Sequence, residues 1–189
     1  MTVHPLCPAL ATAERRQMVV MFCDIAGSSA LAARMDAESF GALIVAYRRL
    51  VAATVERHGG RVARYVGDGV LACWGHPRAR DDDAQRALAA ALAIRAAFAP
   101  SGPHALSLRI ALDAGFVIVG DLAAGAAQSA DVVGEAPNAA AELQAAAAPG
   151  EALVTDSLRA LAGHAFVFES LGERRLKARA APEAVFRLA

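Results

Sequence analysis

Apolar and polar positions along the chain follow two different periods. Between about residues 36 and 58, large apolar side chains recur every three or four positions, which is the spacing of one helix face. These side chains are Phe40, Leu43, Ile44, Tyr47, Leu50 and Val51. The glycines after His58 are typical of a helix C-terminus. The pattern also predicts helices over residues 82–98, with aspartates in the first turn, and over residues 136–148.

Short apolar runs between these helices predict strands. The first run, Met18–Cys23, ends at Asp24. Residues 61–66 and 70–74 are predicted as a hairpin that turns at Gly67-Asp68-Gly69, because Asp-Gly is a strong hairpin signal. Leu106–Asp113 and Phe116–Gly120 are predicted as a second hairpin around Ala114-Gly115.

Residues 17–120 therefore have the order β-α-β-β-α-β-β. This order predicts an α/β (α+β) fold class, with a ferredoxin-like βαββαβ core, a mainly antiparallel open sheet and helices on one face. A Gly/Ala/Ser-rich loop covers residues 122–130, and the chain after residue 150 alternates short strands with one helix, giving a small C-terminal α/β extension. The Pro/Ala-rich residues 1–16 are interpreted as a lead-in, and residues 17–189 as one domain.

Composition excludes some classes of partner. Lys+Arg and Asp+Glu number 19 each, so no basic field favours nucleic acid or an anionic membrane. No apolar run is long enough to span a membrane, and the N-terminus lacks a signal-peptide pattern, which favours a cytoplasmic protein. Cys23 and Cys73 lie in apolar runs and are expected to be reduced core residues.

Two aspartates are the main candidates for chemistry. Asp24 ends a strand and precedes a small-residue loop, Ala26-Gly27-Ser28-Ser29, whose backbone N–H groups suit phosphate. Asp68 lies in the predicted hairpin turn. Together the two carboxylates offer oxygen ligands for Mg2+ and would complete a two-metal clamp of the kind used in phosphoryl chemistry.

Several separated motifs, in order, resemble the class III nucleotide cyclase catalytic domain from about Arg16 to Leu188. Phe-Cys-Asp-Ile-x-Gly-Ser-Ser at residues 22–29 is similar to the first metal motif of that family, and Gly67-Asp68-Gly69 is similar to the second. Asp131-Val-Val-Gly-Glu-Ala-Pro-Asn138 resembles its base-and-ribose segment, and Leu176-Lys177 its triphosphate-binding site.

The resemblance implies a role for each matching residue. Asp24, Asp68 and the carbonyl of Ile25 would bind two Mg2+ or Mn2+ ions per site. Other residues would bind the substrate: Ala26, Gly27, Ser28 and Ser29 the phosphates, Arg64 and Asp131 the base, Asn138 the ribose, and Lys177 the triphosphate.

The implied reaction converts ATP to cyclic AMP and pyrophosphate at the interface of a homodimer. In this family the metal aspartates and the base-reading residues come from opposite subunits. A symmetric dimer would then hold two composite sites.

Two positions depart from the family pattern. Arg64 stands where adenylyl cyclases usually have a lysine, which leaves GTP, UTP or CTP open as alternative substrates. Glu142 stands where the family has a transition-state arginine, one helical turn after Asn138. A carboxylate there would add negative charge where negative charge grows on the phosphates, so the sequence predicts low activity, or a degenerate domain that only binds nucleotide or dimerises.

Each substrate residue also has a plain structural interpretation. Asp131 would be a turn residue and Asn138 an ordinary residue near a helix N-terminus. Arg64, Glu142 and Lys177 would be solvated surface residues. Lys177 is nevertheless the single lysine of the chain, beside eighteen arginines.

Overall fold

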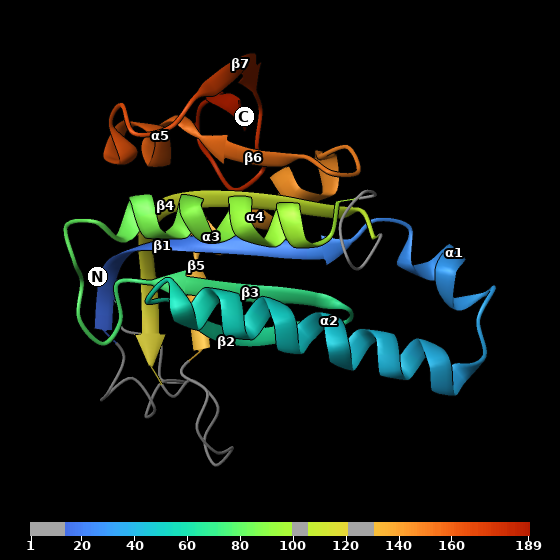
Figure 1. Cartoon of the computed structure of the whole chain (residues 1–189). Coiled ribbons are helices and arrows are strands. Elements are labelled where there is room, and N and C mark those ends of the chain that lie inside the picture. The colour runs from blue at the N-terminus through green and yellow to red at the C-terminus, as the bar shows by residue number, and fades with distance from the viewer. Residues whose placement is uncertain (1–13, 100–105, 121–130) are drawn as a thin grey trace, which may run out of the picture.

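The computed structural model describes residues 14–99, 106–120 and 131–189 (Figure 1). In chain order the elements are β1 (Glu14–Ile25), α1 (Ser28–Ala32), α2 (Ala37–Arg57), β2 (Arg61–Val66), β3 (Gly69–Trp74), α3 (Asp83–Ala97), β4 (Leu108–Gly120), β5 (Asp131–Gly134), α4 (Glu135–Ala146), β6 (Ala152–Thr155), α5 (Asp156–Ala162), β7 (Phe168–Arg174) and β8 (Glu183–Leu188). The predicted loop 122–130 and residues 1–13 of the predicted lead-in lie outside the described residues.

One eight-stranded sheet organises the chain. Its strand order is β2-β3-β1-β4-β6-β8-β7, and β5 pairs with β4. The ladders β2·β3, β3·β1 and β1·β4 are antiparallel, and helices connect β1 to β2 and β3 to β4. This is the order of a ferredoxin-like core, so the predicted fold class is confirmed. The C-terminal strands extend the same sheet, with β6 parallel to β4.

Helices α2 and α3 cover one face of the sheet, as predicted. They lie side by side in front of it in Figure 1. Tyr47 of α2, Trp74 of β3 and Phe98 after α3 belong to the cluster buried between these layers, and the rings of Tyr47 and Phe98 meet edge to face at 5.6 Å. Helix α4 packs on the opposite face against β1 and β4.

The predicted second hairpin is wrong, because β4 is one continuous strand. It pairs with β1 without interruption from Leu108 to Val119, and Ala114 and Gly115 lie inside this ladder. A Cβ atom on Gly115 would come 3.3 Å from the Cβ of Ala136, so this glycine permits close packing of α4. Pairing with a long neighbouring strand therefore overrides the local turn signal. Strand β1 also starts earlier than expected, at Glu14, since Glu14 pairs with Val119.

Candidate active site

Asp24 lies near the end of β1, on the face opposite α2 and α3. Its neighbours Cys23 and Ile25 point into the core beneath those helices. Cys23 and Cys73 are buried free cysteines, as expected. Since side chains alternate along a strand, Asp24 shares its face with Phe22.

Asp68 occupies the two-residue turn between β2 and β3. Gly67 before it has φ 59°, a conformation that favours glycine. A Cβ atom on Gly69 would lie only 2.8 Å from the ring of Phe22, so the turn packs directly on that ring. Because Phe22 is two residues from Asp24, this packing brings the turn close to the end of β1.

The two carboxylates lie close enough to change each other's ionisation. Burial, and then the neighbouring Asp68 carboxylate, raise the pKa of Asp24 to about 7. Burial alone would raise the pKa of Asp68 as well, but contacts with Asp24 and Ser28 outweigh it and hold that pKa below its usual range. Two acids this close, without a cation, share a proton.

This donor set fits a divalent cation. Oδ2 of Asp68 is buried and accepts no hydrogen bond from the described residues. Oδ1 of Asp24 accepts the backbone N–H of Ile25 at 2.9 Å, which fixes that carboxylate. Among the described residues, no three or more His, Cys, Asp or Glu side chains are arranged so that they could hold a metal ion. The remaining ligands of Mg2+ or Mn2+ would therefore be a carbonyl such as that of Ile25, phosphate or water.

Two adjacent residues of α2 support the two aspartates, and sequence analysis missed this role. The hydroxyl of Tyr47 donates to the carbonyl of Cys23 at 3.0 Å, and the guanidinium of Arg48 donates to the carbonyl of Gly67. Each acceptor is the residue immediately before an aspartate. In the sequence, Tyr47 was interpreted only as part of an apolar helix face. No pattern in the sequence indicated that its hydroxyl is a hydrogen-bond donor.

The small-residue loop after Asp24 leads into α1 through Gly27, which has φ 72°. The first N–H groups of a helix have no intrahelical acceptor. From the sequence we expect the backbone N–H of Ala26 to bind phosphate as well. That expectation is wrong, because this N–H already donates to the carbonyl of Ser107 at 2.8 Å.

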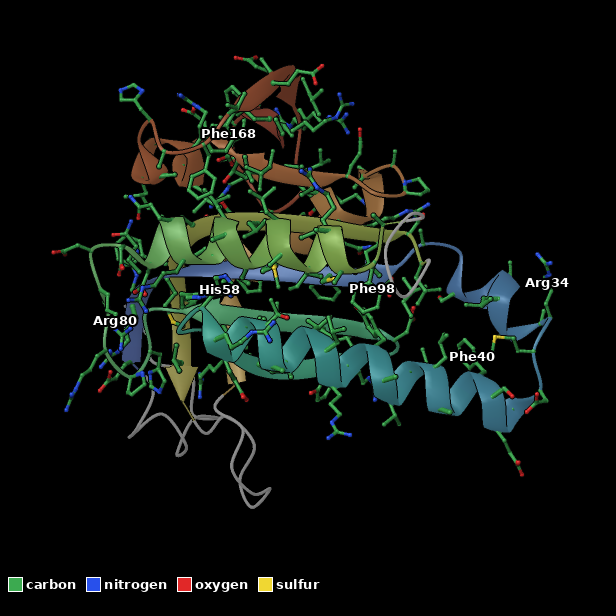
Figure 2. All side chains as sticks on the ribbon, in the orientation of Figure 1. Arg34, Phe40, His58, Arg80, Phe98 and Phe168 are labelled. Atoms are coloured by element: carbon green, nitrogen blue, oxygen red, sulfur yellow. The ribbon has the colours of Figure 1, made fainter. Side chains whose placement is uncertain are left out.

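A cavity of about 330 Å³ adjoins this loop. Ser28, Ser29 and Asp68 line it together with Phe40, which lies near the N-terminal end of α2 (Figure 2). A polar loop and an acidic turn thus face an open space at the end of the sheet.

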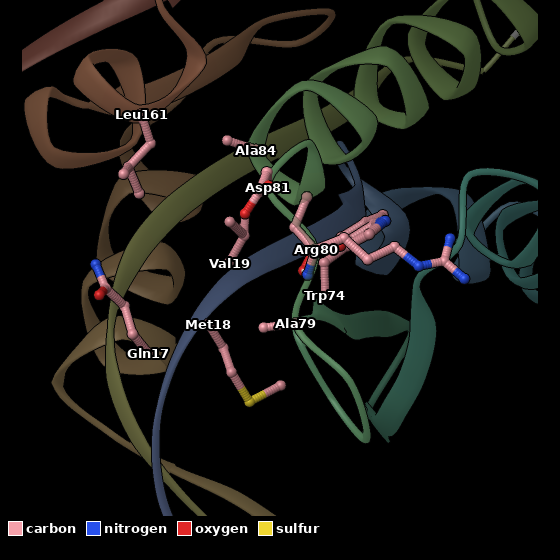
Figure 3. Close-up of a pocket in the computed structure, with 10 residues that line it drawn as sticks. Gln17, Met18, Val19, Trp74, Ala79, Arg80, Asp81, Ala84 and Leu161 are labelled. Atoms are coloured by element: carbon pink, nitrogen blue, oxygen red, sulfur yellow. The ribbon is translucent and has the colours of Figure 1, made fainter.

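Another cavity, of about 340 Å³, lies toward the opposite end of β1 from Asp24 (Figure 3). Its lining includes Gln17, Trp74 and the start of α3. The carboxylate of Asp83 there accepts the backbone N–H of Arg80 at 2.8 Å, which holds the loop before α3. This cavity is separate from the aspartate pair.

The predicted base and ribose residues do not join the aspartates within the described protomer. Arg64 is exposed on β2, opposite Leu71, and Asn138 is exposed on α4. Asp131 begins β5, but its side chain lies outside the described part of the structure. Neither Arg64 nor Asn138 has a hydrogen bond or ion pair with Asp24 or Asp68 among the described residues.

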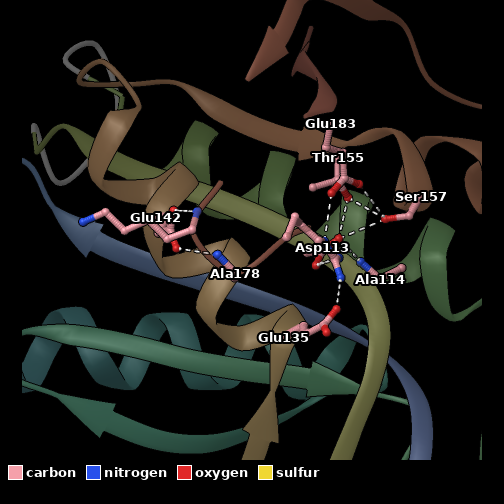
Figure 4. A network of polar contacts seen from close by, with 10 residues as sticks. Asp113, Ala114, Glu135, Glu142, Thr155, Ser157, Ala178 and Glu183 are labelled. Carbon is pink, nitrogen blue, oxygen red and sulfur yellow. Dashed lines mark hydrogen bonds and ion pairs between the residues drawn. The ribbon is translucent and has the colours of Figure 1, made fainter. Parts of the chain in front are cut away.

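Glu142 accepts hydrogen bonds from two consecutive backbone N–H groups, which the sequence did not predict. Its Oε2 accepts the backbone N–H of Lys177 at 2.7 Å, and its Oε1 accepts that of Ala178 at 3.1 Å (Figure 4). Both oxygens are therefore directed at the loop between β7 and β8. These contacts do not test the expected effect of Glu142 on activity, which stays a prediction.

A second polar network holds the same loop, and sequence analysis did not find it. The guanidinium of Arg179 forms ion pairs with Asp113, Glu135 and Glu183. Asp113 is fully buried and also accepts the hydroxyl of Thr155 at 2.6 Å (Figure 4). Burial raises the pKa of Asp113, although Thr155 and Arg179 both oppose this rise.

Comparison with known proteins agrees with this fold and with the cyclase resemblance. The sequence model of the "Adenylate and Guanylate cyclase catalytic domain" family matches residues 10–188. The chain therefore belongs to that family, whose members' activity is nucleotide cyclisation.

Among curated relatives, an uncharacterised protein of Rhizobium meliloti is 32% identical over 178 residues, covering 92% of this chain and 17% of the relative. An uncharacterised protein of Mycobacterium tuberculosis is 34% identical over 130 residues, covering 69% of this chain and 24% of the relative. The chain thus spans less than a quarter of the length of either relative.

Solved structures share the fold. The adenylyl cyclase CyaB from P. aeruginosa has a TM-score of 0.84 at 23% identity, with 94% of this chain and 95% of that chain covered. The guanylyl cyclase Cya2 has a TM-score of 0.85 at 22% identity, with 94% of each chain covered. Among the described residues, no helix has the length and apolar character needed to cross a membrane.

Proposed function

We propose that this cyclase domain converts ATP to cyclic AMP and pyrophosphate, using two divalent cations at a homodimer interface. The observation that carries the proposal is the close pair of Asp24 and Asp68 beside an open cavity. A buried carboxylate oxygen without a hydrogen-bond partner is costly unless a cation binds it.

Asp24, Asp68 and the carbonyl of Ile25 would hold two Mg2+ or Mn2+ ions. When bound, these ions lower the pKa of the attacking 3′-hydroxyl and neutralise charge on the phosphates. The 3′-hydroxyl gives up its proton to solvent as its oxygen forms a bond to the α-phosphorus. The bond from that phosphorus to the bridging oxygen breaks, and pyrophosphate leaves.

The other residues of the chain bind and orient the nucleotide. Backbone N–H groups of Gly27–Ser29 would contact the phosphates. Lys177 would contact the triphosphate and Asn138 the ribose. Arg64 and Asp131 would read adenine, offering donors to its N1 and an acceptor to its N6 amino group.

Dimerisation completes the proposed site. Arg64 and Asn138 make no hydrogen bond or ion pair with the aspartate pair among the described residues, which supports reading of the base and ribose by the partner subunit. Two identical chains related by a two-fold axis would then form two equivalent sites.

The test is an assay of purified protein with Mn2+ and each of the four ribonucleoside triphosphates. We expect cyclic AMP from ATP and slower turnover of the other three. Faster turnover of GTP, UTP or CTP would contradict the base assignment. Nucleotide binding without any cyclic product would instead favour a domain that binds but does not cyclise.

A further inference from the structure

The loop between β7 and β8, residues 175–182, is attached to the rest of the domain on both sides of Lys177. Before the lysine, Leu176 is only 5% exposed and belongs to a buried apolar cluster that includes Ala139 and Leu143 of α4. After it, Arg179 is held by Asp113, Glu135 and Glu183, as described above.

Between these two attachments, Glu142 binds the backbone of Lys177 itself. One carboxylate accepts two consecutive N–H groups, at 2.7 Å from Lys177 and 3.1 Å from Ala178. Hydrogen bonds to an ionised acceptor are stronger than those between neutral groups. The position of the lysine's main chain is therefore set by a residue 35 positions earlier in the sequence.

The side chain of Lys177 remains available for a ligand. It is exposed, and it takes part in none of the ion pairs between described residues. Both oxygens of Glu142 are used by main-chain N–H groups, so the carboxylate fixes the backbone of the lysine without neutralising its ammonium group.

We propose that Glu142 is a positioning residue that orders the Lys177 loop so that the lysine ammonium meets the triphosphate of the substrate. This inference rests on the proposed function, since it needs Lys177 to bind a triphosphate. In the family pattern, the position of Glu142 carries an arginine. In this chain it carries a carboxylate, which would instead position the cation of Lys177 on the loop between β7 and β8. Replacing Glu142 by arginine would then remove two hydrogen bonds and release the loop.

The experiment measures KM and kcat for Mn2+-ATP in a double-mutant cycle of Glu142→Ala and Lys177→Ala. We expect Glu142→Ala to raise KM about tenfold, the size of effect expected for losing charge-assisted hydrogen bonds, with a smaller change in kcat. In the Lys177→Ala background, the same substitution should change KM by less than about twofold, because the lysine it positions is gone. Glu142→Gln keeps one acceptor oxygen, so its KM should lie between the KM of the unmodified protein and that of Glu142→Ala.

Glu151→Ala is the matched control. Glu151 also accepts a backbone N–H, that of Ala148 at 2.8 Å, and it pairs with Arg187. It therefore reports the effect of losing a similar carboxylate contact elsewhere in the domain. We expect its KM to stay within about twofold of the unmodified protein, as for a substitution without a shared partner.

Affinity for inorganic tripolyphosphate with Mn2+, measured by calorimetry, separates this inference from the proposed function. If no triphosphate is cyclised, the proposed function fails, but the same coupling between Glu142 and Lys177 must still appear in tripolyphosphate affinity. Equal effects of Glu142→Ala in both backgrounds, no tripolyphosphate binding by the unmodified protein, or a higher kcat in Glu142→Arg would each overturn the inference.

Discussion

At the scale of single residues, the proposed chemistry depends first on Asp24 and Asp68. We expect Asp24→Asn and Asp68→Asn each to abolish the rise in melting temperature caused by Mn2+. Each should also lower kcat by at least about a hundredfold, because altering even the outer partners of a metal site typically costs 10–100-fold. Thermal melts with and without Mn2+, together with cyclase assays, check this.

Asp82→Asn is the control for that prediction. Asp82 is an exposed acid that pairs with Arg86 at 2.7 Å. It lies at the start of α3, so its substitution should leave the response to Mn2+ intact. A normal Mn2+ response in both Asp24→Asn and Asp68→Asn would show that the metal binds elsewhere.

Base choice is the second prediction at this scale. Arg64→Lys should keep or raise activity with ATP, because lysine also donates to the N1 acceptor of adenine and is the smaller group. Arg64→Glu combined with Asp131→Cys should shift preference toward GTP, since guanine presents the reverse polarity on that edge. The ratio of kcat/KM for ATP and GTP measures the shift, and an unchanged ratio in the double variant would remove both residues from base reading.

Single residues were also where prediction from sequence was most uneven. The closeness of Asp24 and Asp68 could be predicted because each lies in a distinctive local motif. The partners of Glu142 were not, because its hydrogen bonds come from a loop 35 residues later. The N–H of Ala26 was assigned to phosphate for the same reason, since its acceptor Ser107 is distant in the chain.

At the scale of elements, α2 links the two halves of the proposed metal site. Tyr47→Phe removes the donor to the carbonyl of Cys23 and leaves it buried without its partner, which should cost about 1–3 kcal/mol of unfolding free energy. Arg48→Ala should loosen the turn at Gly67 with less effect on stability, because that contact is exposed. Both variants should weaken Mn2+ binding, as measured by titration of the purified proteins.

Tyr65→Phe and Arg49→Ala are suitable controls for these variants. Tyr65 is 47% exposed on β2, and Arg49 is exposed on the same helix as Arg48. Neither should change Mn2+ affinity. Unaltered Mn2+ binding in Tyr47→Phe and Arg48→Ala would show that α2 supports the fold without positioning the aspartates.

The contrast between α2 and β4 shows why some elements were predictable. Residues 36–58 carry their own evidence, an apolar period together with the glycines that end the helix. The structure adds an N-cap, because Asp36 accepts the N–H of Ser39 at 2.8 Å. Strand β4 contains Ala114 and Gly115, which resemble a turn when read alone. Their extended conformation depends on pairing with Val19 and Met18 of β1, which no local pattern reveals.

At the scale of the whole molecule, the central prediction is that each site needs two subunits. Asp24→Asn and Asn138→Ala, each inactive alone, should regain activity when the two proteins are mixed. In a random mixture half the dimers are mixed and each has one intact site, so about a quarter of the unmodified activity should return. Cyclase assays on mixtures, alongside each variant alone, measure this recovery.

The control for that mixture combines two variants from the same half of the site. Asp24→Asn mixed with Asp68→Asn should stay inactive, because every composite site then carries one of the two changes. Activity in this mixture, or none in the first, would contradict the proposed arrangement.

The order of strands in the sheet has a consequence for how the protein is made. Strand β8, Glu183–Leu188, lies between β6 and β7, although it follows both in the chain. Until the ribosome has added these residues, β6 and β7 lack the strand that pairs with both of them, and Arg179 lacks its partner Glu183. Before this strand is made, the loop that carries Lys177, the only lysine of the chain, is therefore held by fewer contacts, although Asp113, Glu135 and Glu142 have already been synthesised. If Lys177 binds the triphosphate as proposed, that site is completed only once Glu183–Leu188 has been synthesised.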